Sequence, residues 1–69
     1  MSIARNTEIS ATSTQSFEDA LRQGLARATK TLRNVRSAWI KEQEVHVGSD
    51  GNIDEYKVVM VVTFVLDDA

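Results

Sequence analysis

The sequence predicts an α+β fold in the order strand, helix, strand, strand, with a three-stranded antiparallel sheet packed on one helix. Three observations predict it: an apolar stripe at helical spacing, two β-rich runs after it, and a turn between those runs that is typical of a hairpin. A chain of 69 residues is one domain at most, so we assign residues 1–69 to a single domain.

The helix is predicted from the spacing of apolar residues between positions 16 and 35. These residues recur three, four and seven positions apart, which places them on one side of a helix. They are Phe17, Leu21, Leu25, Ala28, Leu32 and Val35. Ser16 is expected to cap the first turn through its hydroxyl. Gly24 costs about 1 kcal/mol relative to Ala inside a helix, so we expect it to allow close approach of another backbone.

The two β-rich runs cover residues 38–47 and 56–66, and the stretch between them begins with Gly-Ser-Asp-Gly-Asn. Asp50 and Gly51 are expected to supply the positive-φ residues of a tight hairpin turn. Residues 4–11 alternate more weakly and are assigned as the first strand. A right-handed strand-helix-strand crossover followed by a hairpin places the third strand between the first two.

The last strand is apolar on both faces, which predicts association between copies. One row contains Tyr56, Val58, Met60, Val62, Phe64 and Leu66, and the other contains Val59, Val61 and Val65. One helix can cover only one row, so the other row is expected to meet a second subunit. A domain of about 60 residues also buries only about 60% of its unfolded surface. Since the chain has no cysteine for a disulfide, oligomerisation is the expected remedy.

Composition disfavours several classes of function. The absence of cysteine excludes disulfides and thiolate zinc sites and suits a reducing cytoplasm, which is the expected location. No apolar run approaches the roughly 18 residues of a membrane span, and the net charge of −2 disfavours nucleic acid as a partner. A Ser-His-Asp set, a phosphate loop and an HExxH motif are missing from the sequence, so we expect no enzyme activity.

The charges are segregated along the chain. Basic residues are concentrated in the helix and just after it, at Arg22, Arg27, Lys30, Arg33 and Arg36, and acidic residues are common from Asp50 onward. One interpretation is an ordinary separation of helix surface from loops and termini. The other is a pair of complementary surfaces in an assembly.

The chain resembles the dodecin family over nearly its whole length. The resemblance is carried by Gly-Leu-Ala-Arg-Ala at 24–28, Lys-Thr-Leu-Arg at 30–33, Trp39, and the run from Tyr56 to Asp68, together with their order and spacing. It implies a hollow homododecamer of 23 symmetry in which pairs of flavins stack between symmetry-related tryptophans. The implied function is storage or sequestration of riboflavin or FMN, with no bond made or broken.

The resemblance also implies roles for four residues. Trp39 corresponds to the flavin-stacking tryptophan, although packing at a subunit interface would equally explain it. Glu44 corresponds to an acid near the ribityl chain, but regular alternation puts it on the face opposite Trp39, so this role requires a bulge or twist. His46 replaces an arginine of FMN-binding members and could contact a phosphate when protonated, or be an exposed strand residue without a role.

Lys57 stands where flavin-binding members usually carry a glutamine that hydrogen-bonds the ring edge. Lysine has donors but no acceptor, so it cannot replace both halves of an amide contact. The stretch from Ser37 to Trp39 also looks one or two residues longer than in flavin binders. Both features resemble a dodecin subgroup associated with cations. The alternative function is therefore a flavin-free shell that has a structural role or binds calcium-type cations through carboxylates gathered at symmetry axes.

Overall fold

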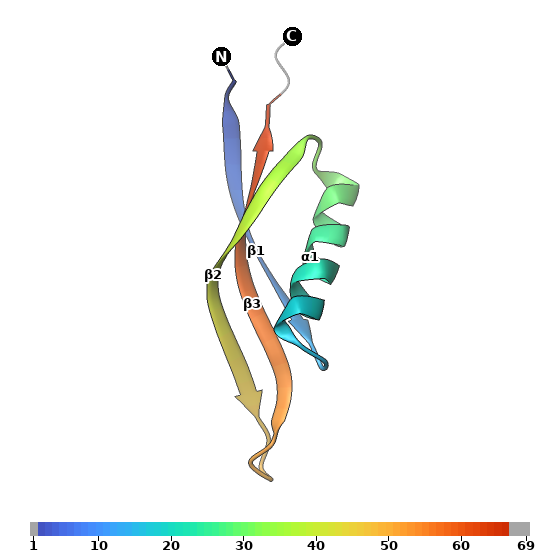
Figure 1. Ribbon diagram of the computed structural model, residues 1–69, viewed down its shortest axis with the longest axis vertical. Helices are drawn as coiled ribbons and strands as arrows, with labels where there is room; N and C mark the ends of the chain where they lie inside the picture. Colours follow the sequence, from blue (N-terminus) through green and yellow to red (C-terminus); the bar gives the residue numbers. More distant parts are fainter. Residues whose placement is uncertain (1, 67–69) are drawn as a thin grey trace.

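The computed structural model describes residues 2–66, which form four elements in the order strand, helix, strand, strand (Figure 1). They are β1 (Ala4–Ser13), α1 (Phe17–Thr31), β2 (Val35–Val47) and β3 (Ile53–Val65). The sheet order is β1-β3-β2, and β3 is antiparallel to both neighbours. The predicted fold and the central position of the third strand are confirmed. Asp67 and Asp68, part of the quoted family resemblance, lie outside the described residues.

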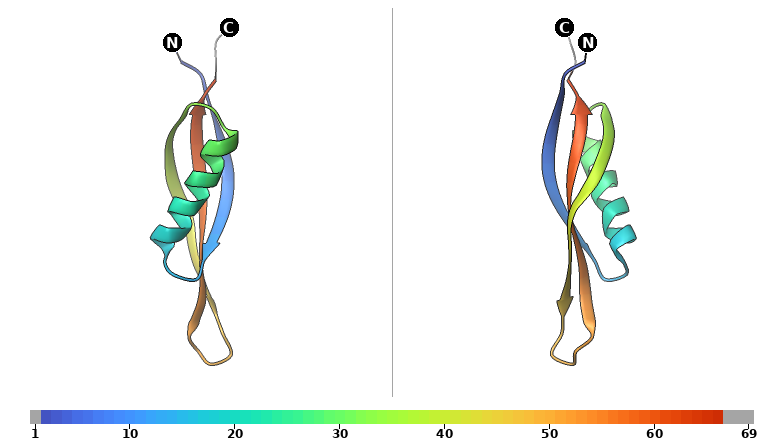
Figure 2. Two further views of the ribbon diagram at one scale, coloured as in Figure 1. Left: turned by 90° about the vertical axis from the view of Figure 1, so that its right-hand side faces the viewer. Right: turned by 60° about the vertical axis from the view of Figure 1, so that its left-hand side comes forward.

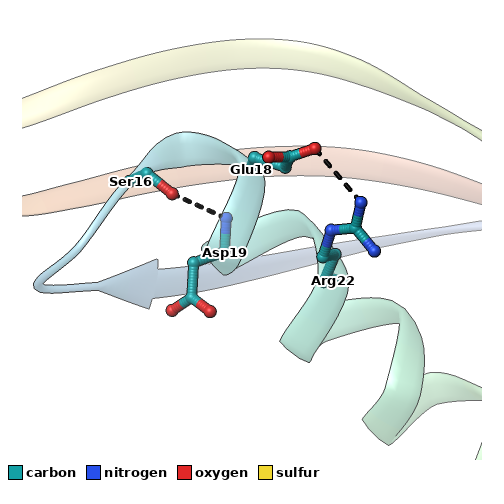
Figure 3. A network of polar contacts seen from close by, with 4 residues as sticks. All are labelled: Ser16, Glu18, Asp19 and Arg22. Atoms are coloured by element: carbon teal, nitrogen blue, oxygen red, sulfur yellow. Dashed lines mark hydrogen bonds and ion pairs between the residues drawn. The ribbon is translucent and has the colours of Figure 1, made fainter.

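Helix α1 begins where the sequence predicts and is capped as expected. The Ser16 hydroxyl oxygen accepts a hydrogen bond of 2.9 Å from the backbone N–H of Asp19 (Figure 3). Glu18 lies in the same first turn and pairs with Arg22 at 3.2 Å, one helical turn further on. Acidic side chains in this turn face the positive end of the helix dipole, which stabilises the start of the helix.

The helix ends earlier than its apolar stripe suggests, and the assignment of Val35 to that stripe is wrong. Leu32 is the C-cap, and Asn34 adopts a left-handed backbone with φ of 60°, which turns the chain into β2. Asn34 is fixed there because its backbone oxygen accepts from the Val65 N–H at 3.0 Å. Val35 still packs against the core, but it does so from the first position of β2.

The core lies between α1 and one face of the sheet (Figure 2). Val58, Met60 and Val62 of β3 are fully buried there together with Ala20 of the helix. A Cβ added to Gly24 would lie 2.6 Å from Met60 Cε and 3.2 Å from Ala11 Cβ. The expectation that another backbone approaches Gly24 is therefore wrong, because the groups that come close are the side chains of Met60 and Ala11.

Strands β2 and β3 continue past the start of the helix and end in the predicted hairpin (Figure 1). Gly51 has φ of 85°, whereas Asp50 does not have a positive φ, so the expectation for Asp50 is wrong. Asp50 instead accepts a hydrogen bond of 3.0 Å from the Asn52 N–H, which also holds the pKa of Asp50 below its ordinary value. Its contribution to the turn comes from its carboxylate and not from its backbone conformation.

Within residues 2–66, the structure has no helix that is both long enough and apolar enough to span a membrane.

Candidate functional site

The sheet has a second face that α1 does not cover, and we call it the helix-free face. Residues directly opposite each other on antiparallel strands point to the same side, so the strand register identifies its members. On β3 they are the residues that alternate with the buried Val58, Met60 and Val62: Glu55, Lys57, Val59, Val61, Thr63 and Val65. All six are half-buried in the single chain, and the apolar ones form the second row that the sequence predicts.

Trp39 lies on the helix-free face, in a row with Val61 of β3 and Glu8 of β1. Its relative exposure is 56%, which is high for so large an apolar side chain. The ring pair found in residues 2–66 joins Phe17 and Tyr56 on the other face, with centroids 5.2 Å apart. The Trp39 indole is therefore exposed beside an apolar row and can stack on a flat ligand or a second chain.

An irregularity in β2 decides where Glu44 lies. Ile40 pairs with Met60, and Glu42 pairs with the adjacent Val59. Lys41 has no partner on β3 and is therefore the extra residue of a bulge. One extra residue reverses the alternation of everything after it. Glu44, which a regular strand would place opposite to Trp39, therefore shares the helix-free face with it. The bulge that the predicted role of Glu44 requires is present.

His46 is held between two carboxylates on the same face. Its Nε2 lies 2.9 Å from Glu44 Oε2, and its Nδ1 lies 3.4 Å from Glu55 Oε1. A neutral imidazole can donate from one nitrogen only, whereas an imidazolium can donate to both carboxylates. All three side chains are about half exposed. The arrangement orients the Glu44 carboxylate and occupies one of its oxygens.

Lys57 faces Glu44 directly across the β2-β3 ladder, and Thr12 on its other side across the β1-β3 ladder. All four residues predicted for the site, Trp39, Glu44, His46 and Lys57, therefore lie on one face of the sheet. Their roles toward a ligand remain predictions.

One further pair on this face was not predicted from the sequence. Lys41 Nζ lies 2.9 Å from Glu8 Oε1, so the side chain of the bulge reaches across β3 to β1. The hydrogen bond and charge of Glu8 raise the pKa of Lys41 above its ordinary value. The partners are separated by 33 positions, and only the sheet order and the bulge bring them together. Because Glu8 is in the same row as Val61 and Trp39, the pair lies on the helix-free face.

A second irregularity lies just before Trp39, between Val35 and Ser37. It occurs next to the stretch that looks longer than in flavin-binding dodecins. In residues 2–66, no cluster of three or more His, Asp or Glu side chains is placed to hold a metal ion.

This chain is similar to known proteins both in sequence and in structure. The family profile described as Dodecin matches residues 3–67. The dodecin of Thermus thermophilus is 36% identical over 66 residues, which cover 96% of this chain and 94% of that protein. A crystal structure of a single-residue mutant of the T. thermophilus dodecin superposes with a TM-score of 0.91 at 35% identity, with full coverage of both chains.

Two further solved structures extend the comparison. The dodecin from Streptomyces davaonensis has a TM-score of 0.90 at 34% identity, covering 97% of each chain. The calcium dodecin of Mycobacterium tuberculosis, described as having a novel calcium-binding site, has a TM-score of 0.81 at 28% identity, covering 97% of this chain and 94% of that one. With a family match over nearly its full length, the chain belongs to the Dodecin family, a family of small flavin-binding dodecameric proteins.

Proposed function

We propose that this chain assembles into a homododecameric shell that binds and sequesters a flavin, riboflavin or FMN, stacked on Trp39. The observation that carries the proposal is the bulge at Lys41, which gathers Trp39, Glu44, His46 and Lys57 on the helix-free face. A cytoplasmic location stays a prediction from the sequence.

The residues present suit a flat, partly polar ligand. The exposed Trp39 indole offers a wide π face, and such stacking contributes about 0.5–1.5 kcal/mol beyond area burial. The neighbouring row of Val59, Val61 and Val65 supplies an apolar surface that a second copy would bury together with the ligand. Sequestration against an indole quenches the photochemistry of the flavin without any catalytic step.

The polar residues suit the flavin side chain better than the ring edge. Glu44 can accept hydrogen bonds from ribityl hydroxyl groups. A protonated His46 can pair with the phosphate of FMN when one of its ring nitrogens leaves Glu44 or Glu55. Lys57 can donate to a ring carbonyl but cannot accept from the ring N–H. We therefore expect weaker binding than in a protein with glutamine at this position.

The test is a titration of flavin-free protein with riboflavin or FMN, followed by flavin emission. The parent chain should quench the emission, Trp39→Phe should retain part of the quenching, and Trp39→Ala should lose most of it. The same samples should give a mass of about twelve chains by light scattering, because the apolar rows demand burial between subunits. Equal quenching in all three proteins, or a monodisperse monomer, would remove the proposal.

The second candidate is a shell that binds a divalent cation in place of flavin, or that serves a structural role. It is favoured by Lys57 at the glutamine position and by the likeness to a calcium dodecin. Carboxylates repeated by symmetry would supply the six to eight oxygens that calcium prefers. We propose such a site only between chains, where like-charged carboxylates brought close together require a counter-ion.

Thermal melts with chelator and with millimolar calcium, at fixed ionic strength, separate the two candidates. A ligand that binds only the assembled state stabilises it by about 2.7 kcal/mol at a hundredfold excess over Kd. A higher Tm with calcium supports the cation site. Coincident melts together with an ion-free elemental analysis would eliminate it.

A further inference from the structure

Two pairs of polar side chains lie next to each other at the hairpin end of the helix-free face. Glu44 of β2 faces Lys57 of β3, and two residues further along both strands His46 faces Glu55. We call these four residues the charged row. The contacts of His46 with both glutamates join the two pairs into one cluster.

The charged row has no excess of positive charge. Two carboxylates and one ammonium give a net charge of −1 when the imidazole is neutral, and of 0 when it is protonated. A phosphate monoester carries about −1.5 to −2 at neutral pH. The row therefore offers such a phosphate no net attraction in either state of His46.

The ring nitrogens of His46 are already engaged. Nε2 lies 2.9 Å from Glu44 Oε2, and Nδ1 lies 3.4 Å from Glu55 Oε1. An imidazolium can direct both of its N–H groups at these carboxylates, whereas a neutral imidazole has one N–H and no charge. A phosphate at His46 would have to displace a carboxylate and then remain beside it, and like charges repel each other.

The lysines of this face are engaged in the same way. Lys41 Nζ lies 2.9 Å from Glu8 Oε1. Lys57 lies opposite Glu44 and two residues from Glu55 on the same face of β3, so the charged residues next to it in the register are both acidic. The proposed flavin site also assigns its ammonium to a ring carbonyl, away from the phosphate end of the ligand.

An uncharged hydroxyl suits the row better than a phosphate. Glu44 uses Oε2 for His46, which leaves its second carboxylate oxygen as an acceptor. A hydroxyl group can donate to a carboxylate, and such charge-assisted hydrogen bonds are strong. The side chain of riboflavin ends in a hydroxyl at the position where FMN carries its phosphate.

We propose that the helix-free face selects riboflavin over FMN and that Glu55 is the residue that determines this choice. Glu44 can serve both ligands through the ribityl hydroxyls, whereas Glu55 engages Nδ1 of His46 and adds the second negative charge. Without Glu55 the row would carry a charge of 0 or +1, and one imidazole nitrogen would be free for a phosphate. This selectivity rests on the proposed flavin site and names its ligand.

The first measurement compares the two flavins on the parent chain. Emission titrations at pH 7 and fixed ionic strength should give a Kd for FMN that is about three- to tenfold higher than the Kd for riboflavin, the range expected for a few half-exposed charges. Equal Kd values, or tighter binding of FMN, would overturn the selectivity.

Glu55→Gln should lower the Kd for FMN at least about threefold and leave the Kd for riboflavin within about twofold. The matched control is Glu42→Gln, which removes the same charge from the same face, opposite Val59. Glu42 is four residues from His46, about 13 Å along β2 at roughly 3.3 Å per residue. The control should leave the ratio of the two Kd values unchanged. An equal response of the two variants would refute the assignment of Glu55.

A double variant tests whether the gain depends on the imidazole. Glu55→Gln combined with His46→Gln should lose most of the gain for FMN, because the freed nitrogen is then missing. Full retention of the gain would show that the charge of Glu55 acts alone and would refute the part of His46. Circular dichroism and light scattering verify the fold and assembly of every variant.

The selectivity and the flavin site fail in different ways. Quenching of both flavins with equal Kd values and with the expected loss in Trp39→Ala would refute the selectivity and leave the flavin site intact. Quenching of neither flavin would refute the flavin site and the selectivity with it.

Discussion

A substitution at Gly24 provides a sharp test of the packing between helix and sheet. Two effects of Gly24→Ala oppose each other. Alanine is favoured over glycine inside a helix by about 1 kcal/mol. The new methyl would lie 2.6 Å from Met60 Cε, whereas carbon atoms in good contact are about 3.5–4.0 Å apart.

Met60 would have to move its terminal Cε within the core to make room for the new methyl. It is fully buried, and the new methyl would also lie 3.2 Å from Ala11 Cβ. Overpacking of a well-packed core costs about 1–3 kcal/mol. After the helical gain is subtracted, we expect Gly24→Ala to lower the free energy of unfolding by about 0–2 kcal/mol.

The residue at position 60 decides whether Gly24→Ala stabilises or destabilises the protein. Met60→Val removes the Sδ and Cε atoms that meet the new methyl, and alone it should destabilise by about 1–3 kcal/mol through the cavity it leaves. In that background Gly24→Ala should be stabilising by about 1 kcal/mol. The coupling between the two sites should therefore be at least about 1 kcal/mol, within the range for residues in contact.

Urea unfolding of the four proteins at one fixed chain concentration measures this coupling, since association makes stability concentration-dependent. Ala26→Gly, at an exposed position of α1, gives the intrinsic cost of glycine in this helix. Additive effects of Gly24→Ala and Met60→Val, within about 0.5 kcal/mol, would refute the contact as the reason for glycine at position 24.

Four further outcomes are expected. Ser16→Ala should lower the free energy of unfolding by about 1 kcal/mol in denaturant melts, because the Asp19 N–H loses its acceptor; no change would contradict the cap. Lys57→Gln should tighten flavin binding in the emission titration, and an unchanged Kd would mean that Lys57 is not the impediment. The raised pKa of Lys41 means that its contribution to stability is present below about pH 10.4 and fades as the pH rises further, so Lys41→Met should flatten the alkaline limb of a stability profile. The lowered pKa of Asp50 has the opposite sign: its contribution is present above about pH 3.9 and is lost as the pH falls, so Asp50→Asn should flatten the acid limb.

Regular features of the fold could be predicted because their signals are local or periodic. The stripe from Phe17 to Leu32, the cap at Ser16 and the turn at Gly51 all depend on residues close in sequence. The end of the helix could not be placed, because Val35 continues the helical spacing while belonging to a strand. The chain turns at Asn34, whose left-handed backbone is fixed by its bonds to Val65, 31 positions away.

The second apolar row of β3 was predicted from the alternation of side chains along the strand alone. It correctly indicated a face that the helix leaves uncovered. The contacts on that face could not be predicted from the sequence. The Lys41–Glu8 pair and the enclosure of His46 by Glu44 and Glu55 depend on the register between strands. Register in turn depends on bulges, and those have no clear signature in a run such as residues 35–47.

The bulge at Lys41 shows why the length of a segment can matter as much as its residues. Trp39 and Glu44 are five positions apart, an odd number, so a regular strand would hold them on opposite faces. The unpaired Lys41 shifts the alternation by one residue, so Glu44 lies on the same face as Trp39. The side chain of Lys41 itself reaches Glu8. The same shift moves His46 to the side of Glu44 and Lys57. The bulge at Lys41 thus places on one face of the sheet the polar side chains that we propose to contact a ligand.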